Sequence, residues 1–244
     1  MNQILNRIKY SIILLFILFA TLLYAQNKYP IILVHGFMGW GREEMGSYRY
    51  WGGKNDIEQQ LKDRGYQVYT ANVGPLSSNW DRAIELYYQI KGGEVDYGKG
   101  HSQLFGTIQK PKGKVYKGLY PKWDKNHPVH LVGHSLGGQT IRMLDYLLKT
   151  SILDSLNINE KSDFLGNIHI GWIKSITSIS SPHNGTTLSD IVTNGIPFLQ
   201  DFIALGSVVG STFYNFDLEQ WGFKRKKEES LRSYFTRMQK HPAW

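Results

Sequence analysis

Short apolar runs alternate with amphipathic stretches along most of the chain. The run from Ile31 to Val34 contains no polar residue and ends at His35-Gly36, which predicts a buried strand that leads into a loop. Three further segments have the composition of strands, namely Gln67 to Val73, Val129 to Val132 and Ile173 to Ile179. These four segments are the expected strands of one sheet.

Helical segments are predicted between these strands. A capping-box start at Asn55, with a glutamate three residues later, and a stop at Gly65 predict a first helix. Ser78 opens a second helix that extends to about Ile90 and ends at a pair of glycines. A third helix is expected from Leu136 to Lys149.

The order of these elements predicts the fold class. Strands and helices in alternation favour an α/β fold with a mainly parallel sheet flanked by helices. The stretch from Glu94 to Asn126 is rich in Gly, Lys and Tyr without a clear period, so we expect it to form loops or an insertion.

The N-terminal residues have a different pattern from the rest. Arg7 and Lys9 precede an uncharged apolar run from Ile12 to Tyr24, which is the layout of a signal peptide. We therefore expect residues 1–25 to be removed and residues 26–244 to form one secreted domain. The alternative is an uncleaved membrane anchor, although the run is short for a helix that needs about 20 apolar residues to span a bilayer.

Composition narrows the class of protein further. With 244 residues, 41% hydrophobic and 20% charged, the chain can bury the core of one domain and is not disordered as a whole. The absence of cysteine excludes disulfides and a thiol nucleophile. The net charge of +8 is spread along the chain except at Lys224 to Lys227, so we expect no nucleic-acid partner.

The segment Gly133-His134-Ser135-Leu136-Gly137 fits the pattern G-x-S-x-G. It follows a predicted strand and precedes a predicted helix, as a nucleophile turn requires, and the small glycines allow the tight bend. The turn would expose the Ser135 hydroxyl, and the new helix would point its free N–H groups at the same place. The alternative is a glycine-rich helix start capped by a serine.

A second element of such a site is expected after the first strand, at His35-Gly36-Phe37. Acyl transfer uses the N–H of the residue after the nucleophile, here Leu136, together with an N–H from an early loop, here that of Phe37. The two amides would bind the developing oxyanion, and each such donor contributes about 3 kcal/mol of transition-state stabilisation.

Together these residues resemble the large secreted bacterial lipases of the staphylococcal and thermoalkalophilic type. The matching segments run in order along the chain: PIILVHGFMGWGREEM from Pro30, YWGGKNDIEQ from Tyr50, VGPLSSNWDRA from Val73, GGEVDYGKGH from Gly92, GHSLGGQTIRML from Gly133, SPHNGTTL from Ser181 and LEQWGF from Leu218. The resemblance implies an α/β-hydrolase that cleaves triacylglycerols, with Ser135 as the nucleophile and Phe37 and Leu136 as oxyanion donors.

The resemblance also shows what this sequence lacks. In the family the catalytic Asp and His follow the position of Trp244, so the C-terminal part of the fold is expected to be missing here. The histidines that remain after Ser135 are His169, His183 and His241. The family has the Ser-Pro-His-Asn-Gly segment in addition to its catalytic histidine, so we expect His183 to be structural.

The family carries a structural zinc ion bound by two aspartates and two histidines. Asp81 and His101 correspond to one ligand of each kind, Thr107 occupies the position of the second histidine, and the second aspartate would follow Trp244. Two ligands hold zinc poorly, because structural sites normally have four. We therefore expect no cofactor in catalysis and at most a partial zinc site.

An apolar stretch from Leu188 to Val209 corresponds to the helical lid of the family. Such a helix stays closed in water and exposes an apolar patch against lipid, whereas a pair of core helices would give a similar pattern.

Two readings of the whole chain follow. The first is a secreted serine ester hydrolase that acts on acylglycerols at a lipid-water interface without an obligate protein partner, or a carboxylesterase or phospholipase of the same fold. The second is a truncated, inactive lipase fold that binds apolar surfaces, because the acid and base of the triad are absent.

Overall fold

The computed structural model describes residues 2–24, 28–150, 162–187, 221–222, 226 and 228–240. Four parallel strands form the main sheet in the order β2-β1-β5-β6: β1 (Ile31–Val34), β2 (Val68–Ala71), β5 (Val129–His134) and β6 (Ile173–Ile179). A small antiparallel pair joins β3 (Gly93–Glu94) to β4 (Val115–Tyr116). Every residue of β1 is apolar, as expected for a strand that is buried on both faces of the sheet.

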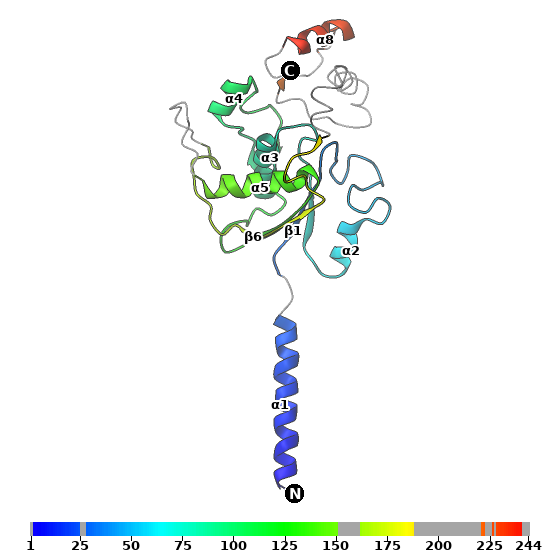
Figure 1. Ribbon diagram of the computed structural model, residues 1–244, viewed down its shortest axis with the longest axis vertical. Helices are drawn as coiled ribbons and strands as arrows, with labels where there is room; N and C mark the ends of the chain where they lie inside the picture. The colour runs from blue at the N-terminus through cyan, green and yellow to red at the C-terminus, as the bar shows by residue number, and fades with distance from the viewer. Residues whose placement is uncertain are drawn as a thin grey trace.

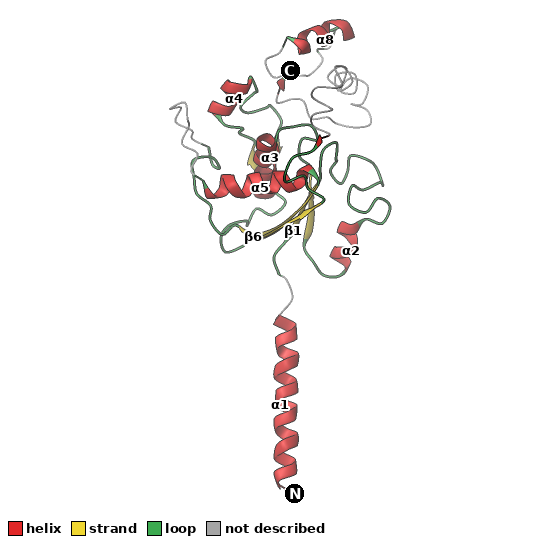
Figure 2. Ribbon diagram, viewed as in Figure 1, coloured by secondary structure: helices red, strands yellow, loops and turns green. Residues whose placement is uncertain are grey.

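The helices are α1 (Asn2–Tyr24), α2 (Ile57–Asp63), α3 (Asn79–Lys91), α4 (Lys99–Phe105), α5 (Leu136–Lys149) and α8 (Leu231–Gln239). Helix α5 contacts β1, β5 and β6, and α3 packs against α5 and β2 (Figure 1). Helix α2 contacts the outer strand β2. Figure 2 shows helices α3 and α5 beside the sheet. The chain therefore has the α/β architecture that the sequence predicts.

The apolar core lies between the sheet and helices α3 and α5. Its fully buried side chains include Ile32, Ile84, Leu131, Ile141 and Leu144. Helix α5 buries Ile141, Leu144 and Leu148 at spacings of three and four, the spacing of one helix face. Burial of that face fixes the end of α5 that follows Ser135.

Strand register brings the predicted site together at one edge of the sheet. Val34, the last residue of β1, pairs with Ala71 of β2 and with Gly133 of β5. Parallel strands that end at the same level place their following loops side by side. His35-Gly36-Phe37 and Ser135 are therefore neighbours, although 97 residues separate Gly36 from Gly133 in the sequence.

All the predicted strands and helices are present, and three of them have the predicted bounds. β1, α5 and β6 span the predicted residues, and α3 has Ser78 as its N-cap, with the hydroxyl accepting from the Asp81 N–H at 3.1 Å. The cap of α2 differs: it is Asp56, not Asn55, and its carboxylate accepts from the Gln59 N–H at 3.0 Å.

The stretch from Glu94 to Asn126 contains more regular structure than predicted. It begins in the β3-β4 pair and contains α4, which ends at Gly106 with a φ of 65°. Of the two predicted alternatives, loops or an insertion, the structure has an insertion with regular elements, and the sequence did not reveal α4 because it is only seven residues long and has no apolar period.

Helix α1 lies below the sheet in Figure 1 and is joined to β1 through residues 25–30. In the portion of the chain that the structure describes, no helix combines the length and the apolar character needed to cross a membrane. Cleavage after Ala25 stays a prediction.

Candidate active site

The turn between β5 and α5 holds Ser135 in an unusual backbone conformation. Its φ of 54° and ψ of −126° lie outside the regions that side-chain-bearing residues normally occupy, at a cost of about 1–3 kcal/mol. The Ser135 N–H donates to the Ile179 carbonyl at 2.9 Å, and the Gly138 N–H donates to the Ser135 carbonyl at 3.0 Å. Such strain, held by neighbouring bonds at a helix start, is a feature of functional turns.

The three glycines of the turn have no room for a side chain. A Cβ at Gly137 would lie 2.2 Å from the Val34 carbonyl oxygen, and one at Gly138 would lie 1.9 Å from the Ser181 hydroxyl oxygen. A Cβ at Gly133 would lie 2.5 Å from the Gly137 carbonyl oxygen. The glycines therefore allow α5 to start directly against β1 and the segment after β6.

The loop after β1 touches the serine. A Cβ at Gly36 would lie 2.8 Å from Ser135 Cβ, so the glycine is required for the two loops to meet. The Gly36 carbonyl accepts from the Gly39 N–H at 3.1 Å and from the His35 ring at 2.9 Å, which fixes the peptide between Gly36 and Phe37.

The two amides predicted as oxyanion donors are available in this arrangement. Among the residues that the structure describes, neither the Phe37 N–H nor the Leu136 N–H donates a hydrogen bond to another group. Leu136 is the first residue of α5, where N–H groups have no partner within the helix. Phe37 follows the glycine that contacts Ser135. Both N–H groups therefore remain without a partner among the described residues.

His35 is a completely buried member of this loop. Its Nδ1 bonds to the Gly36 carbonyl, so Nδ1 carries the hydrogen, and its Nε2 accepts from the Val73 N–H at 3.3 Å. Burial, together with the nearby charge of Arg82, lowers the pKa of His35 from 6.5 to about 3. His35 is therefore neutral at ordinary pH and cannot serve as a readily protonated base.

Two buried charged residues, Arg82 and Glu85, bind the loops that follow β1 and β2, and the sequence analysis missed both. Arg82 on α3 is fully buried and donates to the Gly74 carbonyl at 2.6 Å, to the His35 carbonyl, and to the Thr140 hydroxyl at 2.8 Å. Glu85, also fully buried, accepts from the Gly74 N–H at 2.6 Å and from the Lys114 ammonium at 2.8 Å. Arg82 lies within the quoted VGPLSSNWDRA segment, and Glu85 follows it by two residues. The available signal in the sequence was that these charged residues come before an apolar helix face.

Tyr50 was also missed. Its hydroxyl oxygen lies 2.9 Å from the Gly36 nitrogen and 2.5 Å from His134 Nδ1. The quoted YWGG segment contains Tyr50, but nothing in the pattern of the sequence shows that it reaches the nucleophile turn.

The histidines after Ser135 do not supply a base within the described residues. The His169 N–H donates to the carbonyl of Leu148, near the far end of α5 and roughly 20 Å from Ser135 at 1.5 Å per residue. His183 uses both ring nitrogens, accepting from Arg142 at 3.1 Å and bonding the Ser178 hydroxyl at 2.9 Å. His241 lies outside the described residues. The Ser135 hydroxyl bonds to no residue that the structure describes.

The two residues predicted as zinc ligands bind each other. His101 Nε2 lies 2.9 Å from Asp81 Oδ1, and the His101 ring stacks on Trp80 with centroids 5.2 Å apart. Across the described ranges, no group of three or more His, Cys, Asp or Glu side chains is placed to hold a metal ion. Thr107, at the family's second histidine position, offers a hydroxyl that is a poor zinc ligand. These residues do not fit the four-ligand site of the family.

We therefore predict that the chain loses zinc on dialysis against a mild chelator, because two ligands that already pair with each other bind the ion weakly. Metal content and melting temperature, measured before and after dialysis, check this. The Asp81→Ala variant is the control and should match the wild type in zinc content. Stoichiometric zinc that survives dialysis and is lost in Asp81→Ala would contradict the prediction.

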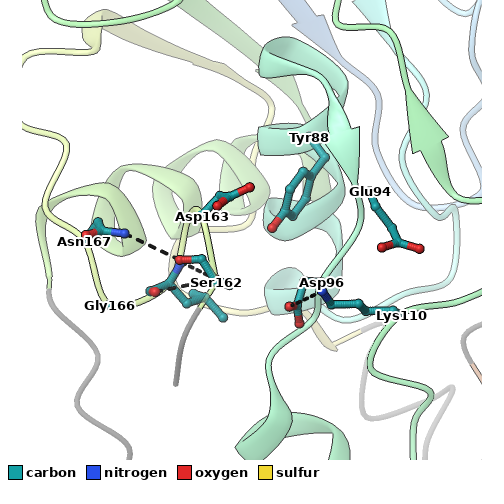
Figure 3. Close-up of a pocket in the computed structure, with 9 residues that line it drawn as sticks. Tyr88, Glu94, Asp96, Lys110, Ser162, Asp163, Gly166 and Asn167 are labelled. Atoms are coloured by element: carbon teal, nitrogen blue, oxygen red, sulfur yellow. Dashed lines mark hydrogen bonds and ion pairs between the residues drawn. The ribbon is translucent and has the colours of Figure 1, made fainter. Parts of the chain in front are cut away.

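A cavity of about 510 Å³ lies away from the nucleophile turn, between α3 and the segment that follows residue 161. Figure 3 shows Glu94 and Asp96 on one side of it, Asp163 on the other and the Tyr88 ring between them. Lys110 pairs with Asp96 at 3.4 Å. No residue of the nucleophile turn lines this cavity, and its carboxylates are unsuited to an acyl chain. The predicted lid, Leu188 to Val209, lies outside the described residues, as do all residues of the basic run Lys224 to Lys227 except Lys226.

Comparisons with known proteins agree with this architecture. A family model described as "Lipase-like, C-terminal domain" matches residues 27–244. Lipase 1 of Staphylococcus aureus is 41% identical over 230 residues, which cover 90% of this chain and 33% of that protein.

Two solved structures are similar throughout the body of the chain. Staphylococcus hyicus lipase superposes with a TM-score of 0.79 at 39% identity, covering 90% of this chain and 58% of that one. EstA from Clostridium botulinum gives a TM-score of 0.73 at 43% identity, covering 88% of this chain and 51% of that one. The chain thus spans about a third of the staphylococcal protein and a little over half of the two solved chains.

Proposed function

The chain belongs to the family of lipase-like C-terminal domains, and from that premise we propose that it is the nucleophile-bearing part of a serine ester hydrolase that cleaves acylglycerols. The observation that carries the proposal is the strained Ser135 at the start of α5, with the Phe37 and Leu136 amides beside it. Relatives named as lipases support the substrate class.

The reaction follows from these groups. The Ser135 oxygen attacks the ester carbonyl carbon, its proton passes to a base, and the carbonyl oxygen becomes an oxyanion between the two amides. The alcohol then leaves with a proton, and water releases the acid from the acyl-enzyme. The serine chemistry needs no cofactor. The base and its acid come from outside the described residues, as the family resemblance implies.

The N-terminal residues and the apolar stretch complete the proposal. Residues 1–25 act as a signal peptide, so that the domain formed by residues 26–244 is exported. Leu188 to Val209 acts as a lid that opens at a lipid-water interface, which makes lipid the partner of the enzyme.

We predict that an active-site-directed fluorophosphonate labels Ser135. The serine oxygen bonds to phosphorus, fluoride leaves, and the proton goes to the base, so the chain should be extended by the family's acid- and base-bearing segment for this test. Ser135→Ala should abolish labelling and lower ester hydrolysis by at least about 10⁴-fold. Mass spectrometry of the labelled peptide and a short-chain ester assay measure both effects.

Ser47→Ala is the matched control, because Ser47 is an exposed serine in the loop region between β1 and α2. It should label and turn over like the wild type. Labelling that survives Ser135→Ala would refute the nucleophile. An extended chain that folds, is not labelled and binds lipid vesicles would favour the inactive lipid-binding reading instead.

A further inference from the structure

The Tyr50 hydroxyl lies between the two loops of the proposed site. It accepts from the Gly36 N–H at 2.9 Å, since an amide nitrogen can only donate. The same hydroxyl also forms a hydrogen bond with His134 Nδ1 at 2.5 Å, since a phenol can both accept and donate. One group thus joins the residue before Phe37 to the residue before Ser135.

The Tyr50 ring is held by aromatic neighbours on several sides. Its centroid lies 5.3 Å from Trp40 in an edge-to-face contact, 5.7 Å from Trp51, and 5.7 Å from His134. Burial of the hydroxyl raises the pKa of Tyr50 above its ordinary value of 10.0, although the bond from Gly36 opposes this. The hydroxyl therefore keeps its hydrogen at neutral pH and remains a donor.

The backbone of Tyr50 is anchored independently of the site. The next-door Arg49 exchanges two backbone hydrogen bonds with Gly53, both at 3.0 Å. Arg42 binds Asp56 through two hydrogen bonds of 2.7 and 2.6 Å, and Arg49 Nε lies 3.5 Å from the same carboxylate. Tyr50 therefore presents its hydroxyl from a fixed loop.

Two peptide groups meet at Gly36. In the first, the Gly36 N–H donates to the Tyr50 hydroxyl and the His35 carbonyl accepts from Arg82. The second contains the Gly36 carbonyl, which accepts from the His35 ring and the Gly39 N–H, together with the Phe37 N–H. Because Gly36 joins the two groups, a shift of the first also moves the Phe37 N–H. A misplacement of an oxyanion donor by about 1 Å is enough to lose much of its effect.

We propose, on the basis of the function proposed above, that Tyr50 is a positioning residue that aims the Phe37 N–H at the oxyanion by tying Gly36 to His134. It touches no reacting atom. Its role is to set the distance between the early loop and the nucleophile turn, so that both donors meet one oxygen.

The test is an NMR titration of the isotope-labelled chain with butaneboronic acid. The Ser135 oxygen bonds to boron, its proton passes to solvent, and boron becomes a tetrahedral anion that mimics the oxyanion without a leaving group. In the wild type both the Phe37 and the Leu136 amide signals should shift. In Tyr50→Phe the Leu136 shift should remain, the Phe37 shift should largely vanish, and affinity should fall by about tenfold, a part of what a whole donor contributes.

Two controls separate positioning from general damage. Tyr48→Phe removes a neighbouring hydroxyl from a half-exposed ring and should leave both shifts unchanged. At His134, asparagine keeps an acceptor close to the position of Nδ1 whereas leucine removes it, so the Phe37 shift should be larger in His134→Asn than in His134→Leu. Melting curves confirm that each variant is folded.

The outcomes distinguish the two proposals. Equal shifts and equal affinity in wild type and Tyr50→Phe would overturn the positioning role and leave the proposed nucleophile in place. Parallel loss of both shifts in a folded Tyr50→Phe would also overturn it, because a structural role predicts that pattern. If neither amide responds in the wild type, the oxyanion site itself is wrong, and the positioning role fails with it.

Discussion

Replacing Arg82 by methionine is expected to lower the free energy of unfolding by about 3–5 kcal/mol, because three buried hydrogen bonds are lost and each acceptor left unpaired costs about 1–3 kcal/mol. The side chain is fully buried, and its three donating nitrogens bind the Gly74 and His35 carbonyls and the Thr140 hydroxyl. Methionine fills the same space but leaves these acceptors without a donor in the core. For a domain of this size the melting temperature should fall by about 6–20 °C.

Arg82→Met should also disturb the arrangement of the candidate site. Arg82 links the loop after β1 to α5, the helix that starts at Ser135. Arg82→Lys should give a smaller loss of stability, because a single ammonium cannot reproduce the planar fork of a guanidinium. The control is Arg64→Met, an exposed arginine at the end of α2, which should change stability by less than about 0.5 kcal/mol. Equal melting temperatures for Arg82→Met and Arg64→Met would contradict this account of the network.

The parts of the fold that could be predicted are those in which local pattern and tertiary packing agree. β1 is apolar at every position, α5 has a continuous buried face after a glycine turn, and both have the predicted bounds. The position of Ser135 in a tight turn could be predicted for the same reason, because a strand, a turn and a helix start leave few conformations for the residue between them.

The parts that could not be predicted depend on long-range contacts. Arg82 and Glu85 have the residue types of an exposed helix face, yet both are fully buried because loop carbonyls and amides pair with them. The hydrogen bond from Tyr50 to His134 joins residues 84 apart. The error at the start of α2 has a local cause, because Asn55 and Asp56 are both good caps and only Asp56 also pairs with Arg42.

Acidification is expected to destabilise the chain through His35. Its pKa is about 3 in the folded protein, against 6.5 for an unburied histidine, because burial and the charge of Arg82 disfavour the protonated ring. Above pH 6.5 the ring is neutral in both states, so it contributes no pH dependence. Below that pH the unfolded chain binds a proton that the folded chain does not, and the free energy of unfolding falls until the pH reaches about 3. At pH 5 the loss should amount to about 2 kcal/mol relative to pH 8.

Urea unfolding of His35→Gln and wild type at several pH values between 8 and 5 isolates this contribution, because the other titrating groups cancel in the difference. His35→Gln should be clearly less stable at pH 8, where it loses the fixed bonds to Gly36 and Val73. It should approach the wild type as the pH falls, since only the wild type retains a group that favours the unfolded state in acid. Gln103→Ala, which changes an exposed side chain that does not titrate, is the control and should remain parallel to the wild type. A constant gap between His35→Gln and wild type across this range would mean that His35 has the same pKa in the folded and unfolded chain, and the buried neutral histidine that fixes the Gly36 carbonyl would have to be abandoned.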